Sequence, residues 1–127
     1  MEEYASLAKI VHPAGVGKMT KSIEVEGHPI DNIVDKFNLV PGFIKIDAEG
    51  AEQMVICGAV NTIIRHKPVI LSELSDTLLS SFYGSSEKVI TFLQKNGYSV
   101  FNAKAPTLPI KFPFVGEIIA LPKKNSN

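Results

Sequence analysis

Phe43-Ile44-Lys45-Ile46-Asp47-Ala48-Glu49-Gly50-Ala51-Glu52 is the most informative run of this sequence. Its first four residues follow Pro41-Gly42 and predict a short strand that stops at Asp47. Residues 49–66 then predict a helix, which Gly58 kinks or divides in two because glycine is a poor helix former. A strand followed directly by a helix is the first half of a βαβ unit, so the run indicates an α/β fold.

The same alternation continues on both sides of this run. Upstream, residues 1–20 predict mostly loop, residues 21–27 a half-exposed strand and residues 29–37 a short amphipathic helix. Downstream, the pattern predicts strands over residues 69–74, 98–101 and 117–121, and a helix that begins after Ser85 and ends at Gly97. Strands joined by helices run parallel, and we expect helices on both faces of their sheet. The last connection has no helix, so the last strand is expected to be antiparallel.

Composition excludes several classes of protein. The 127 residues carry 13 Lys plus Arg against 13 Asp plus Glu, which argues against a nucleic-acid partner held by bulk charge. No apolar run approaches the ~18 residues of a membrane span, and the N-terminus lacks the pattern of a signal peptide. We therefore expect no membrane partner and a cytoplasmic location. The single cysteine, Cys57, is expected in the core, and no metal site is expected because the three histidines lack ligand spacing.

Acidic residues follow two neighbouring strands of the expected sheet. Asp47 comes directly after the first parallel strand, and Glu73 stands at the end of the second. Adjacent strands lie about 4.8 Å apart, so the two carboxylates are expected over one rim, where open α/β sheets bind ligands. A close carboxylate pair suits general base catalysis or the binding of a cation. Acids at positions 47, 49 and 52 also cancel the positive end of the expected helix, which disfavours a phosphate ligand.

These acids also have a purely structural interpretation, which the sequence leaves open. Asp47 would cap the helix, Glu49 and Glu52 would complement its dipole, and Glu73 would be a solvated loop acid. Under this interpretation the chain is an unrelated α/β binding domain.

The run at residues 43–52 resembles the "IKIDVEGAE" signature of the FkbM-type methyltransferase family, with Ala48 in place of valine. Further similarities follow in the same order. Gly58-Ala59 resembles a later Gly-Ala of the family, residues 67–74 resemble its "KPxxLxEL" strand, and Asn96-Gly97-Tyr98 resembles its "GY". Upstream, residues 29–34 resemble its "TLDDL" helix. The resemblance covers about residues 22–102.

This resemblance implies a Rossmann-like methyltransferase of class I that uses S-adenosylmethionine as its cofactor. The acceptor would be a hydroxyl oxygen of a sugar or other small molecule. Asp47 and Glu73 would be the catalytic residues, either of them orienting or deprotonating the acceptor, and Asp47 and Glu49 would contact the cofactor.

The resemblance also implies an incomplete site. Nothing in residues 1–42 supplies the glycine-rich cofactor loop of the family, so the chain is expected to be the C-terminal half of a methyltransferase domain. We expect residues 1–21 to be irregular, residues 22–121 to form this half domain and residues 122–127 to be a polar tail. The isolated chain is then expected to be inactive, and the strand Phe43–Ile46 would be an exposed edge that pairs with another chain. The alternative is a non-catalytic α/β remnant or assembly module that no longer binds the cofactor.

Overall fold

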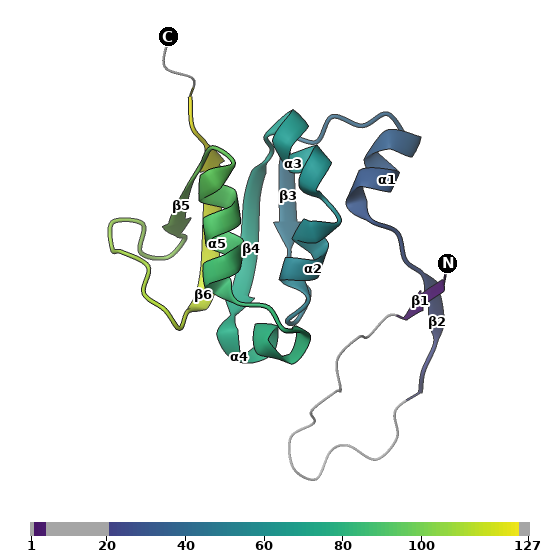
Figure 1. The fold of residues 1–127 in the computed structure, drawn as a ribbon, viewed down its shortest axis with the longest axis horizontal. Coiled ribbons are helices and arrows are strands. Elements are labelled where there is room, and N and C mark those ends of the chain that lie inside the picture. The colour runs from purple at the N-terminus through teal and green to yellow at the C-terminus, as the bar shows by residue number, and fades with distance from the viewer. Residues whose placement is uncertain (1, 5–20, 125–127) are drawn as a thin grey trace.

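The computed structural model describes residues 2–4 and 21–124 of the chain. Its elements follow one another in an α/β order (Figure 1). They are β1 (Glu2–Tyr4), β2 (Glu24–Glu26), α1 (Ile30–Lys36), β3 (Phe43–Ile46), α2 (Glu52–Cys57), α3 (Val60–His66), β4 (Val69–Ser75), α4 (Asp76–Leu79), η1 (Ser80–Phe82), α5 (Ser86–Lys95), β5 (Tyr98–Asn102) and β6 (Val115–Pro122).

The main sheet has four strands in the order β3-β4-β6-β5. β3 and β4 are parallel, whereas β6 runs antiparallel to both β4 and β5. The predicted α/β class and the predicted antiparallel pairing of the last two strands are therefore confirmed. β6 lies inside the sheet, between β4 and β5, and β3 and β5 form its two edges.

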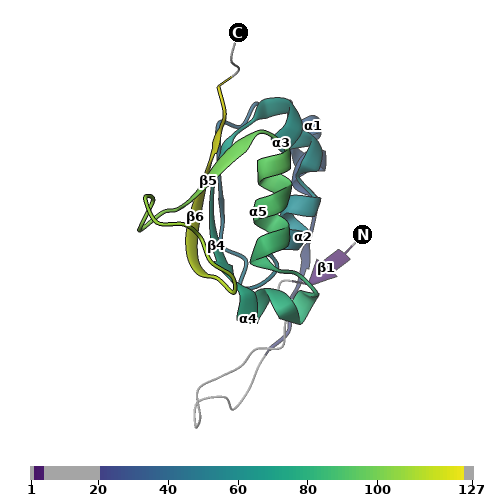
Figure 2. The ribbon, with the colours of Figure 1, turned by 60° about the vertical axis from the view of Figure 1, so that its left-hand side comes forward.

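The prediction of helices on both faces of this sheet is wrong for the described residues. α2 and α5 lie in one layer on the same side of the sheet (Figure 2). The burial of β4 agrees, because Ile70, Ser72 and Leu74 are fully buried while Glu73 between them is exposed. The cause is topological: the crossovers from β3 to β4 and from β4 to β5 advance in the same direction, and right-handed crossovers of one direction share one face.

Gly58 divides the predicted long helix into α2 and α3, as the sequence predicted. The break decides which side chains face the sheet: Ile56, Ala59 and Ile63 are buried, whereas the apolar side chains of Met54 and Ile64 are each 48% exposed. Cys57 is exposed as well, so its predicted core position is wrong.

Tyr98, the first residue of β5, fastens this edge of the sheet to the beginning of β4. Its ring is fully buried, and its hydroxyl donates a 2.7 Å hydrogen bond to the carbonyl oxygen of Pro68. Burial raises the pKa of the Tyr98 hydroxyl to about 12, because a buried phenolate would lose its hydration.

The predicted strand over residues 21–27 is realised only as β2, a three-residue strand whose side chains are all exposed. It pairs antiparallel with β1 in a separate two-stranded sheet, so the prediction of loop is wrong at residues 2–4. Residues 5–20 lie outside the described part of the chain. Within the described part, no helix has the length and hydrophobicity needed to cross a membrane.

Candidate functional site

A buried carboxylate shapes the loop that follows β3. Glu52, the first residue of α2, is only 3% exposed. One of its carboxylate oxygens accepts a 3.0 Å hydrogen bond from the backbone N–H of Ala48, and the other accepts a 2.9 Å bond from that of Gly50. These charge-assisted bonds offset the cost of burying the carboxylate and fix the path of the loop. A structural role for Glu52 is confirmed.

Gly50 is required at the tip of this loop. Its φ is +106°, which is unfavourable for any residue with a side chain. A Cβ atom at this position would lie 2.7 Å from the carbonyl oxygen of Leu78 in α4. The loop after β3 is thereby packed directly against the turn after β4.

Asp47 and Glu49 take no part in this construction. α2 begins at Glu52, three residues later than predicted, and Ala51 in its cap position makes no side-chain hydrogen bond. The hypothesis that Asp47 caps the helix is therefore wrong, and Glu49, with a φ of +51°, stands outside the helix. Both side chains are exposed, and none of the hydrogen bonds in residues 21–124 involves their carboxylates.

Glu73 lies on the strand next to Asp47. Ile46, the last residue of β3, is the register partner of Ser72, so Asp47 and Glu73 are the next residues of two adjacent parallel strands. Ile46 and Ser72 are both buried under the helices, whereas Asp47 and Glu73 are exposed. Side chains alternate along a strand, so the carboxylate of Glu73 belongs to the sheet face that bears no helix, and Asp47 follows the end of the neighbouring strand.

The structure adds a third acid to this face that the sequence analysis did not identify. Glu117 of β6 is the direct register partner of Glu73. Its neighbour Ile118 is fully buried, which places Glu117 on the face without helices, beside Glu73. Like charges directly opposite each other destabilise a sheet, so Glu73 and Glu117 do not stabilise this pair of strands. In the sequence, Glu117 could be recognised only as the acid at the start of the predicted last strand.

Asp76 is a second acid that the sequence analysis missed, and it holds the turn after β4. Its Oδ1 accepts a 2.8 Å bond from the backbone N–H of Ser86. Its Oδ2 accepts bonds of 2.6 Å from the Ser86 hydroxyl and of 2.6 Å from the backbone N–H of Phe114. One carboxylate therefore joins the end of β4, the first residue of α5 and the chain that enters β6.

Burial alone would raise the pKa of the Asp76 carboxyl, but the bonds from Phe114 and Ser86 outweigh it and lower the pKa below 3.8. Asp76 is thus a charged structural acid, and its Oδ2 already accepts two hydrogen bonds within the fold.

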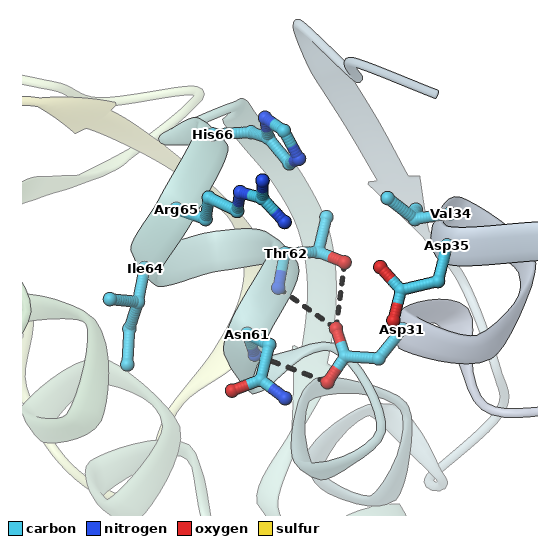
Figure 3. A pocket seen from close by; sticks show the side chains of 8 residues that line it. All are labelled: Asp31, Val34, Asp35, Asn61, Thr62, Ile64, Arg65 and His66. Carbon is cyan, nitrogen blue, oxygen red and sulfur yellow. Dashed lines mark hydrogen bonds between the residues drawn. The ribbon is translucent and has the colours of Figure 1, made fainter. Parts of the chain in front are cut away.

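Asp31 plays a similar role between α1 and α3 (Figure 3). Its carboxylate accepts bonds from the backbone N–H groups of Asn61 (3.1 Å) and Thr62 (2.8 Å) and from the Thr62 hydroxyl (2.7 Å). Although burial raises the pKa of Asp31, these bonds outweigh it and lower the pKa below 3.8. An acid of α1 thereby supplies the cap that α3 lacks in its own sequence.

A pocket of about 320 Å³ lies between these two helices. It is lined by Asp31, Val34, Asp35, Asn61, Thr62, Ile64, Arg65 and His66. Two further hollows, of about 460 and 420 Å³, adjoin the proline-rich loop between β5 and β6. None of these three pockets includes Asp47 or Glu73, whose side chains are both exposed.

No group of three or more His, Cys, Asp or Glu side chains in the described part of the chain has the arrangement of a metal site.

A comparison with known families finds one match. Residues 3–100 match the model described as "Methyltransferase FkbM domain". No curated protein and no solved structure matches this chain.

Proposed function

Because the chain belongs to the FkbM methyltransferase family, we propose that it serves S-adenosylmethionine-dependent methylation of a hydroxyl oxygen. The acceptor would be a sugar or another hydroxyl-bearing small molecule. The observation that carries the proposal is the pair of exposed carboxylates of Asp47, directly after β3, and Glu73 on β4, which form no hydrogen bond within residues 21–124.

The acids of this rim fit the charge of the cofactor. S-adenosylmethionine carries a sulfonium and an ammonium, and its recognition needs carboxylates that are not already committed to the fold. Glu52 is committed, because both its oxygens bind the loop backbone. Asp47 and Glu49 remain free on the same loop, so these two residues are the ones that would hold the cationic groups.

When bound, S-adenosylmethionine supplies an electrophilic methyl group. The residues of this chain would orient the acceptor hydroxyl and take up its proton. The carboxylate of Asp47 or of Glu73 accepts a hydrogen bond from the acceptor hydroxyl and takes its proton as the oxygen becomes nucleophilic. Asp47 and Glu73 are thus two candidates for one step, and single variants distinguish them.

Catalysis by these carboxylates requires a cover that excludes water. Both are exposed, and an exposed carboxylate is strongly hydrated and stabilises charge weakly. We therefore expect no turnover by the 127-residue chain alone. The bare sheet face also favours a second candidate function, a non-catalytic assembly module of the family that keeps the α/β core without cofactor affinity.

An NMR titration separates the two functions. Isotope-labelled chain is titrated with S-adenosylmethionine, and we expect weak binding, with a dissociation constant on the order of millimolar. The backbone resonances that shift should be those of residues 47–50 and Glu73. The neutral thioether S-adenosylhomocysteine should shift them less, because it lacks the sulfonium charge.

Two variants serve as controls for this titration. Asp47→Asn should reduce the shifts, whereas Glu87→Gln, which removes an exposed acid from α5, should leave them unchanged. Shifts confined to other residues, or equal shifts with both ligands, would refute the cofactor site and leave the assembly module.

A further inference from the structure

One of the two edges of the main sheet lies along β3. The backbone N–H of Val69 donates a 2.9 Å hydrogen bond to the carbonyl oxygen of Gly42, so Gly42 faces β4. Backbone groups of a strand point alternately to its two sides, so those of Phe43 and Lys45 point away from β4. Nothing in the described part of the chain pairs with that side. A row of unpaired donors and acceptors is a template for another strand.

Exposed apolar side chains surround this edge. Phe43 is 56% exposed, and Val40, just before it, is 79% exposed. Phe37 and Leu39, in the connection from α1, are also exposed. Covering these exposed apolar side chains would remove apolar surface from water and so favour association.

β2 also lacks a place in a larger sheet. It belongs to a two-stranded sheet that is separate from the main sheet, and such a ribbon is at best marginally stable in water. Val25 of this strand and Ile23, the residue just before it, are exposed, and side-chain alternation sets Val25 opposite the exposed carboxylates of Glu24 and Glu26. The Glu26 carboxylate has only an exposed contact with His28, at 3.5 Å.

We propose that β3 binds β2 of a second copy of this chain as an added edge strand. In both strands, one face bears only apolar side chains and the other bears the charged side chains, so the two patterns match when the strands pair. Ile23 and Val25 would continue the apolar side of Ile44 and Ile46, beneath the helices. On the other side, Glu24 and Glu26 would lie beside Lys45, the only charged residue of β3.

Charge selects this arrangement over the pairing of two β3 strands. β3 contains a lysine and no acid, so two copies of it bring no opposite charges together. β2 supplies two acids to one lysine, and opposite charges across strands stabilise a sheet while like charges destabilise it. The contact is heterologous, because β2 and β3 are different surfaces, so copies add head to tail into a closed ring or an open chain.

Sedimentation equilibrium of the 127-residue chain at low salt tests this proposal. The wild-type protein should have an average mass above that of one chain, and the mass should rise with concentration. Lys45→Glu should weaken association about tenfold, because it turns an attractive contact into a repulsive one. The double variant Glu24→Lys/Glu26→Lys should weaken it similarly. All three positions are exposed, and circular dichroism verifies that each variant is folded.

Restoration of the contact provides the decisive comparison. An equal mixture of the two variants should associate, since each supplies the charge that the other has lost. The triple variant that carries all three changes should associate by itself. A wild-type chain that stays monomeric at every concentration would overturn the proposal. The proposal would also be overturned if the variants associated as strongly as the wild type. It would be overturned equally if Lys45→Glu abolished association and the mixture of variants did not restore it.

Discussion

The loop after β3 and the turn after β4 are each held in place by hydrogen bonds from the backbone to a single carboxylate. In each, one carboxylate gives its oxygens to the backbone: Glu52 binds two N–H groups of its loop, and Asp76 binds two N–H groups and a hydroxyl. Beside each stands an acid that binds nothing in the described residues, Asp47 in the first case and Glu73 in the second. The comparison teaches that engagement with the backbone, rather than position at a strand end, separates the acids that build the fold from those that are free to act.

The largest expected effect belongs to Asp76. Asp76→Asn replaces an oxygen that accepts two bonds with an amide that can only donate, and we expect a loss of about 3 kcal/mol in the free energy of unfolding. Urea unfolding measures this loss. Asp47→Asn is the matched control, and equal losses in the two variants would break the distinction between engaged and free acids.

A somewhat smaller effect is expected from the loop after β3. Glu52→Gln leaves one of two buried backbone N–H groups opposite an amide donor, which should cost about 2 kcal/mol. Gly50→Ala should cost about as much, because the added methyl group meets the carbonyl oxygen of Leu78 and the backbone keeps a positive φ. The same urea titrations measure both variants. A loop that tolerates both changes would not be fixed as described.

Acid sensitivity is the next expected consequence of engagement. Folding lowers the pKa of Asp31 and Asp76 below 3.8, so the stability that they contribute is complete above that value. It is lost as the pH falls through the lowered pKa of the folded state. Unfolding free energies measured between about pH 5 and pH 3 should therefore fall, and fall less steeply in Asp76→Asn. An unchanged slope in this variant would contradict the role of Asp76.

The smallest expected effect concerns the free acids. Asp47→Asn and Glu73→Gln should each change the free energy of unfolding by less than about 0.5 kcal/mol, because no bond is lost. Glu73→Gln is expected to be slightly stabilising, since it removes the repulsion with Glu117. Differential urea unfolding at low and high salt measures this gain, which salt should diminish. A marked destabilisation would mean that Glu73 has a structural partner.

Sequence patterns predicted the parts of this fold that depend on local order. The strand at Phe43–Ile46, the break at Gly58 and the Ser85 cap, which accepts a 3.2 Å bond from the N–H of Lys88, all follow from neighbouring residues. The sequence could not show that Asp76 binds Phe114, 38 positions away, because only the folded sheet brings them together. Nor could it decide whether Asp47 caps the helix, because α2 begins only at Glu52, whose carboxylate binds the backbone of the loop.

A disulfide tests whether Asp47 and Glu73 lie side by side on one open face. Adjacent strands place neighbouring Cα atoms about 4.8 Å apart, within disulfide reach, whereas strands two apart are beyond it. In a Cys57→Ser background, the pair Asp47→Cys/Glu73→Cys should oxidise to an intramolecular disulfide. The pair Asp47→Cys/Glu117→Cys should not. Thiol counting by mass spectrometry distinguishes the outcomes, and two free thiols in the first pair under oxidising conditions would contradict the account.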